Sequence, residues 1–210
     1  RSVESTGRHA IHVRESIMDK LCTVLHCEDG RITGIYYPDQ FTCAVKFSEF
    51  LRKIENKAWY FSRYKRLLAV RISFGIACRI NQITRLSQQI KALPFLRLVI
   101  DEDFPHIING RDNQVLDQLC RYNRVWLGNL GSASQSGNRA MSERCFEGII
   151  MDPQFTADNS GQPIFNSLMK ELEKFASHLI VPGVCTGRYQ QIRLQQFDMG
   201  AGKESWAELH

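Results

Sequence analysis

Short apolar runs alternate with longer amphipathic segments along most of the chain. The runs are rich in Val, Ile and Leu and have the length of buried β-strands, whereas apolar residues between them recur at helical spacing. Strands are expected at residues 21–25, 32–37, 67–74, 96–100, 124–130, 148–151 and 178–184, with a weak eighth strand at 197–201. Helices are expected at residues 43–56, 76–91, 112–122, 137–145, 162–176 and 189–196. This alternation predicts an α/β fold with a mostly parallel sheet, and eight strands favour closure into a TIM-type barrel.

The first two expected strands are separated by too few residues for a helical crossover. The pair Asp29-Gly30 lies between them, and both residue types tolerate the positive φ angles of a tight hairpin turn. We therefore expect an antiparallel hairpin at the start of the barrel, before the parallel strands.

Two of the expected helices have a well-defined apolar face. In the helix at 43–56, the residues at helical spacing are Val45, Phe47, Phe50, Leu51 and Ile54. In the helix at 162–176, Pro163 lies near the start, where its missing N–H costs no intrahelical hydrogen bond. The apolar face of that helix consists of Ile164, Leu168, Leu172 and Phe175.

The overall composition is that of one globular domain. The chain has 210 residues, of which 43% are hydrophobic and 23% are charged, and no linker or low-complexity segment divides it. Residues 1–15 are expected to form a mobile tail, because the first ten residues have little apolar content. A single domain is expected at 16–210.

A formal net charge of +5 is only mildly basic. The densest basic stretch, residues 63–66, follows the aromatic residues 59–61. This mixture resembles a nucleic-acid surface, but it leads directly into an apolar strand. We interpret it as the end of a helix whose cations complement the helix dipole, and we expect no direct nucleic-acid binding. Trp59, Tyr60, Phe61 and Tyr64 are expected to face the core.

Seven cysteines occur without a CxxC motif and without a close cluster with histidine. An odd number of cysteines without a signal peptide is typical of reduced thiols in the cytoplasm. No apolar run approaches the roughly 20 residues needed to cross a bilayer. The sequence therefore predicts a cytoplasmic protein that does not span a membrane and has no structural zinc site.

Functional groups in α/β barrels gather at the carboxyl ends of the strands. Four short stretches lie at such ends and resemble motifs of the EAL-type cyclic-di-GMP phosphodiesterases; they are residues 34–38, 99–102, 127–131 and 180–184. Residues 70–73 and 150–152 resemble two further motifs of that family. The resemblance spans residues 20–203. It implies the modified TIM barrel of the EAL family, with a shortened carboxyl-terminal part.

The resemblance assigns several positions to the metal and nucleotide pocket of the family. Tyr36 stands in place of a metal-binding Glu, and Gln40 in place of an Arg that binds a phosphate. Arg71 stands in place of a metal-binding Asn, whereas Glu102 matches a Glu that the family uses as a metal ligand.

The remaining pocket positions show the same loss of acidic residues. Gly128 and Asn129 replace two Asp residues. Ile150 replaces a Lys that helps to activate water, and Pro182 replaces a Glu. Asp152 matches an Asp of the family, and we expect it to form a turn or a helix cap before the proline that follows. Tyr36 and Ile150 are expected to fill the pocket.

These substitutions remove the chemistry of a phosphodiesterase. Catalysis by a divalent metal needs a set of oxygen ligands, and Glu102 is the only carboxylate at positions 36, 71, 102 and 128. Arg71 also brings a positive charge into the place of the cation, and we expect it to form an ion pair with Glu102. The resemblance therefore implies no catalytic residues, no metal, no cofactor and no cyclic-di-GMP binding.

One degenerate branch of the family is closer to this chain than the enzymes are. Residues 93–98, 100–105, 109–113 and 129–131 resemble the YdiV-type anti-FlhDC factors, which bind the FlhD subunit of the flagellar regulator FlhDC. The resemblance implies an inactive protein that binds FlhD and represses flagellar genes by blocking FlhDC action on DNA. A non-catalytic cyclic-dinucleotide receptor is the alternative. The sequence does not indicate which surface meets the partner.

Overall fold

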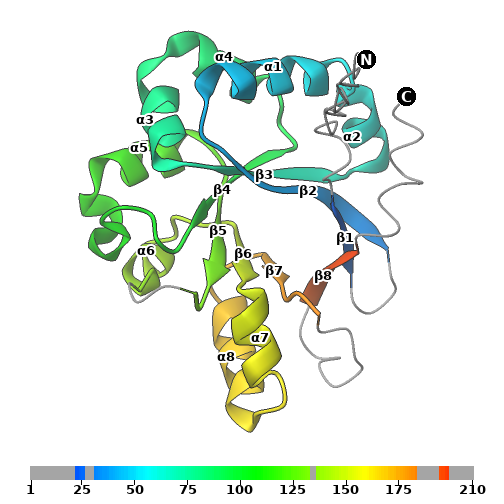
Figure 1. The fold of residues 1–210 in the computed structure, drawn as a ribbon, viewed down its shortest axis with the longest axis vertical. Helices are drawn as coiled ribbons and strands as arrows, with labels where there is room; N and C mark the ends of the chain where they lie inside the picture. Colours follow the sequence, from blue (N-terminus) through cyan, green and yellow to red (C-terminus); the bar gives the residue numbers. More distant parts are fainter. Residues whose placement is uncertain (1–21, 27–30, 133–135, 184–193, 199–210) are drawn as a thin grey trace, which may run out of the picture.

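A computed structural model of the chain describes residues 22–26, 31–132, 136–183 and 194–198 (Figure 1). Within these residues, eight strands form a closed barrel in chain order, from β1 to β8. Neighbouring strands from β2 to β8 are parallel, whereas β1 runs antiparallel to both β2 and β8. The turn expected at Asp29-Gly30 lies outside the described residues. The architecture is the α/β barrel that the alternating pattern predicts.

The strands are β1 (Cys22–His26), β2 (Ile32–Phe41), β3 (Leu67–Ile72), β4 (Leu96–Asp101), β5 (Val125–Leu130), β6 (Gly148–Met151), β7 (His178–Ile180) and β8 (Leu194–Asp198). The α-helices are α1 (Ala44–Glu55), α2 (Ala58–Tyr64), α3 (Phe74–Gln82), α4 (Thr84–Lys91), α5 (Gln114–Tyr122), α6 (Asn138–Ser142), α7 (Pro153–Asn159) and α8 (Pro163–Glu173). A 3-10 helix, η2 (Ile107–Asp112), precedes α5. Among these described helices, none is long and apolar enough to cross a membrane.

Several element boundaries in the first half of the chain differ from the prediction: β2 runs to Phe41 and not to residue 37, and β4 includes Asp101. The strand predicted at 67–74 ends at Ile72, because the Ser73 hydroxyl accepts a hydrogen bond from the Ile76 N–H (3.3 Å) and caps α3. The helix predicted at 76–91 is two helices, because Ile83 adopts an extended conformation between α3 and α4.

The carboxyl-terminal part also differs from the prediction. The last parallel strand before β8 ends at Ile180, so it is shorter than the predicted run at 178–184. Residues 194–196 are predicted as helix, but they belong to β8 and pair with β1 and β7. The predictions for residues 1–15, 189–193 and 199–201 fall outside the described residues.

The core has two parts, one on each side of the barrel wall. Inside the barrel, seven strands contribute one buried hydrophobic side chain each: Val24, Tyr36, Ala69, Val99, Trp126, Ile150 and Ile180. We call these residues the interior cluster. The alternate residues of the strands face the helices and form a larger outer cluster with them, as Leu68 and Val70 of β3 do with Ile76 of α3. This alternation follows from the two-residue period of a strand.

The predicted apolar face of α1 is mostly correct, whereas that of α8 is correct only at Leu172, since Leu168 and Phe175 are partly buried. The buried residues of α1 are Phe47, Phe50, Leu51 and Ile54, and those of α8 are Phe165, Met169 and Leu172. Val45 and Ile164 are exposed, contrary to the prediction, since each lies in the first turn and points off the buried face. On α2, Trp59 and Tyr64 are exposed as well, because a helix of two turns buries one side and here that side is Tyr60 and Phe61.

A polar network lies at the amino-terminal end of the central strands. Glu147 binds the guanidinium of the buried Arg97, and it accepts hydrogen bonds from Arg124 Nη1 (2.9 Å) and from the indole N–H of Trp126 (3.1 Å). Burial by itself raises the pKa of Glu147, but the Trp126 hydrogen bond and the two Arg side chains outweigh it. The pKa of Glu147 therefore lies below its ordinary value.

Candidate functional site at the carboxyl end of the barrel

Alternation along the strands determines which side chains line the carboxyl end of the barrel. Side chains two residues apart lie on the same face of a strand. Arg71 follows Ala69 of the interior cluster at this spacing, and Asp101 and Gly128 follow Val99 and Trp126 in the same way. Asp101 is the direct neighbour of Gly128 in the pairing of β4 with β5. The ends of β3, β4 and β5 therefore bring these three positions together.

Arg71 makes the central contact of this end. Its Nε donates to Asp101 Oδ1 (3.2 Å), and its Nη2 binds Oδ2 of the same carboxylate. Its Nη1 donates to the backbone oxygen of Pro38 (2.7 Å) on β2. The side chains of Arg71 and Asp101 are 23% and 8% exposed, so the ion pair is largely withdrawn from water. One guanidinium thus joins β2, β3 and β4.

The electrostatics of this end favour a charged guanidinium. Burial lowers the pKa of Arg71, but the hydrogen bonds and the negative charge of Asp101 outweigh it, with smaller contributions from Tyr36 and Asp103. The pKa of Arg71 is therefore raised. Because an Arg side chain is not deprotonated in proteins, this end of the barrel contains a permanent cation.

The ion pair expected between Arg71 and Glu102 is formed with Asp101 instead. The reason is that β4 is one residue longer than predicted, so that Asp101 still alternates with Val99 onto the face where Arg71 lies. Glu102 comes after the strand, and its Oε2 accepts a hydrogen bond from the Gly131 N–H (2.8 Å). The buried Glu102 carboxylate therefore fixes the turn after β5. Asp101 was not identified from the sequence as the partner of Arg71. Its position two residues after the buried Val99 could have indicated that it lies on the interior face of the barrel.

Gly128 leaves room for the Asp101 carboxylate. A Cβ atom at this position would lie 2.8 Å from Asp101 Oδ1 and 2.8 Å from Val99 Cγ1, and both distances are well inside van der Waals contact. The space that a side chain at position 128 would fill is thus occupied by Asp101, the partner of Arg71, and by Val99. The next residue, Asn129, has a φ of +50°, and its backbone oxygen accepts hydrogen bonds from the N–H and the hydroxyl of Ser132.

The other predicted pocket positions are buried, partly buried or exposed. Tyr36 and Ile150 are buried in the interior cluster, as predicted for pocket-filling residues. Asp152 caps α7 by accepting a hydrogen bond from the Phe155 N–H (2.7 Å), which confirms the prediction. Gln40 is exposed at the end of β2, where its Nε2 donates to the Ile72 oxygen (3.4 Å). Pro182 is half-buried after β7.

Solved structures with a similar arrangement of strands and helices are EAL domains. The crystal structure of the EAL-like domain protein YdiV has a TM-score of 0.69 and 16% identity, covering 86% of this chain and 93% of that chain. The EAL domain of Mycobacterium smegmatis DcpA has a TM-score of 0.62 and 14% identity, covering 90% of this chain and 93% of that chain. The fold is that of an EAL domain.

The EAL-like chain is also similar in sequence to curated proteins. The putative anti-FlhC(2)FlhD(4) factor YdiV of Escherichia coli K12 is 24% identical over 144 residues, which are 67% of this chain and 60% of that protein. The anti-FlhC(2)FlhD(4) factor YdiV of Salmonella typhimurium LT2 is 22% identical, with the same coverage. The chain spans 60% of the length of these curated relatives. No family model matches the chain. The predicted resemblance to EAL domains and to YdiV-type factors is confirmed.

The residues at the carboxyl end of this EAL-like barrel do not fit a divalent metal. Arg71 is charged, Gly128 has no side chain, and Tyr36 is packed in the interior cluster. A unit positive charge about 4 Å from the guanidinium would be repelled by about 4 kcal/mol in a partly buried site, and a divalent cation by about twice as much. Within the described part of the chain, no three His, Cys, Asp or Glu side chains are grouped to hold a metal ion.

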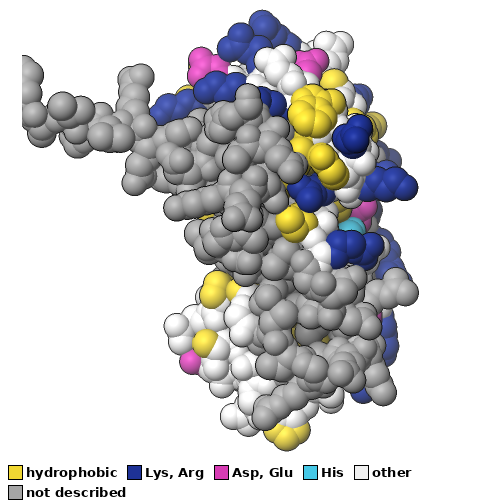
Figure 2. All heavy atoms as spheres, turned by 90° about the vertical axis from the view of Figure 1, so that its right-hand side faces the viewer, with side chains coloured by type: hydrophobic (Ala, Val, Ile, Leu, Met, Phe, Trp, Pro, Cys, Tyr) yellow, Lys and Arg dark blue, Asp and Glu magenta, His cyan; other side chains and the backbone are white. Residues whose placement is uncertain are grey.

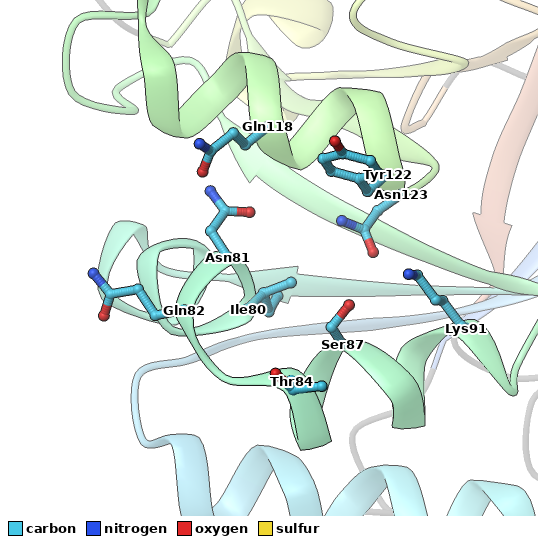
Figure 3. Close-up of a pocket in the computed structure, with 9 residues that line it drawn as sticks. All are labelled: Ile80, Asn81, Gln82, Thr84, Ser87, Lys91, Gln118, Tyr122 and Asn123. Carbon is cyan, nitrogen blue, oxygen red and sulfur yellow. The ribbon is translucent and has the colours of Figure 1, made fainter.

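A separate groove lies on the helical side of the EAL-like barrel, between α3, α4 and α5 (Figure 3). Its volume is about 320 Å³, and it is lined by Ile80, Asn81, Gln82, Thr84, Ser87, Lys91, Gln118, Tyr122 and Asn123. Asn123 donates through Nδ2 to the Leu119 oxygen (3.0 Å), while its Oδ1 is buried without a hydrogen-bond partner in the described structure. The groove is lined mainly by amide and hydroxyl side chains of helices, and no sequence motif predicts it.

Proposed function

We propose that this chain is a non-catalytic EAL-like protein that binds the flagellar regulator FlhC2FlhD4 and inhibits it. The observation that carries the proposal is the similarity over 144 residues to relatives named anti-FlhC(2)FlhD(4) factors. In its finer form, the proposal is that FlhD is the subunit contacted in the cytoplasm. Binding then represses flagellar genes by keeping the complex from promoter DNA, and the chain itself does not contact DNA.

The geometry of the barrel end supports binding without catalysis. Where a phosphodiesterase needs oxygen ligands around a cation, this chain has the Arg71–Asp101 ion pair and a glycine. Gln40 is exposed and uncharged, so its hydrogen bonds to a nucleotide phosphate would be weaker than the charge-assisted hydrogen bonds of an Arg. We therefore propose that the chain neither hydrolyses nor binds cyclic-di-GMP, and that it acts through a protein surface.

The test is association between the purified chain and purified FlhC2FlhD4. We expect a complex in size-exclusion chromatography and a Kd below about 10 μM in calorimetry, which corresponds to at least about 7 kcal/mol of binding free energy. In a gel-shift assay, excess chain should release FlhC2FlhD4 from promoter DNA. No association at tens of micromolar would refute the partner and leave the fold assignment unchanged.

The cyclic-dinucleotide receptor is the second candidate function. It is favoured by the likeness of the fold to a Klebsiella pneumoniae BlrP1 complex with calcium and cyclic-di-GMP, with a TM-score of 0.57 and 15% identity over 84% of this chain and 53% of that chain. Calorimetry with cyclic-di-GMP, with and without Mn²⁺, distinguishes the two candidates. Saturable binding below about 10 μM would support a receptor.

A further inference from the structure

The net charge of the chain is concentrated in one short segment. Residues 52–66, which run from the end of α1 through α2, contain six of the 27 Lys and Arg residues and one of the 22 Asp and Glu residues. The rest of the chain therefore holds 21 of each, and this segment carries the whole formal excess of +5. Five of the six cations form no ion pair with a residue that the structure describes; they are Arg52, Lys53, Lys57, Arg63 and Lys65.

Two large aromatic side chains are exposed among these cations. Trp59 and Tyr64 of α2 are 53% and 42% exposed. Figure 2 views the molecule from the side on which α2 lies and shows hydrophobic side chains gathered between Lys and Arg side chains there. We call Trp59, Tyr64 and the six cations of residues 52–66 the aromatic–basic surface. Exposed apolar side chains rimmed by charges mark interaction sites more often than scattered ones do.

The aromatic–basic surface is held in place by the core beneath it. Buried Tyr60 contacts Trp59 edge-on, with ring centroids 6.1 Å apart, and it contacts Tyr64 at 5.2 Å. The Tyr60 hydroxyl accepts a hydrogen bond from Arg66, whose guanidinium lies 4.9 Å from the centre of the Tyr64 ring. Arg63 lies 6.0 Å from the same ring. These contacts order the guanidinium groups before a partner arrives, which lowers the entropic cost of binding.

We propose that the aromatic–basic surface docks an acidic protein partner, whose contacting face carries carboxylates around an apolar side chain. The inference rests on the proposed function, in which the chain acts by binding a protein. Trp, Tyr and Arg dominate the energetics of protein interfaces, and an excess of +5 within residues 52–66 complements carboxylates. A nucleic acid fits less well, because bases stack on open aromatic faces and guanidinium groups lie against the Tyr64 ring.

The experiment compares variants of the full chain for binding to FlhC2FlhD4 by calorimetry at low and moderate salt. The double variant R63E/K65E reverses two exposed cations of the surface, and W59A removes the exposed indole. The control variant R85E/K170E reverses two exposed cations on α4 and α8, so that its net charge equals that of R63E/K65E. Melting temperatures of all variants verify the fold. R63Q/K65Q, which only removes charge, replaces the reversal variant if that one is destabilised.

We expect R63E/K65E to bind at least about 30-fold more weakly and W59A about tenfold more weakly, whereas the control should bind within about twofold of the wild type. Wild-type affinity should fall as salt rises. If the wild type binds and R63E/K65E binds within about threefold of it, the docking surface is refuted and the proposed function stands. If the wild type does not bind, the proposed function fails and this inference fails with it.

A labelled DNA duplex serves as the second probe. Binding of the duplex by the wild type that is lost in R63E/K65E, together with unchanged binding of FlhC2FlhD4, would make the surface a nucleic-acid site and overturn the proposal. We expect no saturable duplex binding at moderate salt.

Discussion

The ion pair at the barrel end gives a quantitative prediction for Asp101→Ala. The substitution leaves the Arg71 guanidinium with the Pro38 oxygen but without its counter-charge. Breaking a fully buried ion pair by removing one partner costs about 3–5 kcal/mol. Because Arg71 remains 23% exposed and water can solvate part of its charge, we expect the free energy of unfolding to fall by about 2–3 kcal/mol.

A double-mutant cycle measured by urea unfolding and far-UV circular dichroism isolates this interaction. The partner variants are Arg71→Met and the double variant R71M/D101A. The double variant should be more stable than D101A, because it no longer contains an uncompensated charge, and the coupling energy should be about 2 kcal/mol. The exposed Asp158 on α7 provides the control, since Asp158→Ala should change stability by no more than about 0.5 kcal/mol.

A loss of less than about 0.5 kcal/mol in D101A, together with a coupling energy near zero, would contradict this prediction. The Arg71–Asp101 pair would then be a surface contact of the kind that contributes little. The pair would then not be a structural element that holds the barrel end together.

Three further predictions concern the same barrel. Gly128→Asp should lower the free energy of unfolding by more than about 2 kcal/mol, because its Cβ would meet Asp101 Oδ1 at 2.8 Å; a urea midpoint equal to that of the wild type would contradict this. The depressed pKa of Glu147 supplies stability that is complete above the ordinary value of 4.5 and is lost as the pH falls below it. The melting-temperature difference between wild type and Glu147→Gln should therefore shrink below about pH 4.5, and a constant difference down to about pH 3 would argue against it. Tyr36→Glu alone should not confer cyclic-di-GMP binding with Mn²⁺, because Arg71 and Gly128 are unchanged; a calorimetric Kd below about 10 μM would disprove it.

The strands of the barrel could be predicted from the sequence because they are buried on both faces and read as continuous apolar runs. β6 begins and ends at the predicted residues, 148 and 151. Helix boundaries were harder to predict from the sequence. The apolar periodicity continues from α3 through Ile83 to Leu86 and Ile90, which are buried as they would be in one continuous helix. Ile83 is nevertheless extended, and no Gly or Pro in residues 76–91 marks the break.

The candidate site could be predicted only in part. The resemblance to EAL domains placed Arg71 and Gly128 at the same barrel end, where β4 lies between their strands. The identity of the carboxylate that pairs with Arg71 depends on the length of β4, and one extra residue changes it from Glu102 to Asp101. The exposure of Trp59 and Tyr64 was also missed, because residue type alone does not say which side of a short helix is buried.

The close contacts around Gly128 bear on whether evolution could restore catalysis at this site. A carboxylate at position 128 is excluded while Asp101 keeps its position, Asp101 is fixed by Arg71, and Arg71 repels the cation that new carboxylates would bind. A substitution toward a metal ligand at position 71, 101 or 128 is therefore unfavourable while the other two residues are unchanged. A metal centre at this end of the barrel would therefore need changes at several of these positions together, because each contact disfavours the change that the others require.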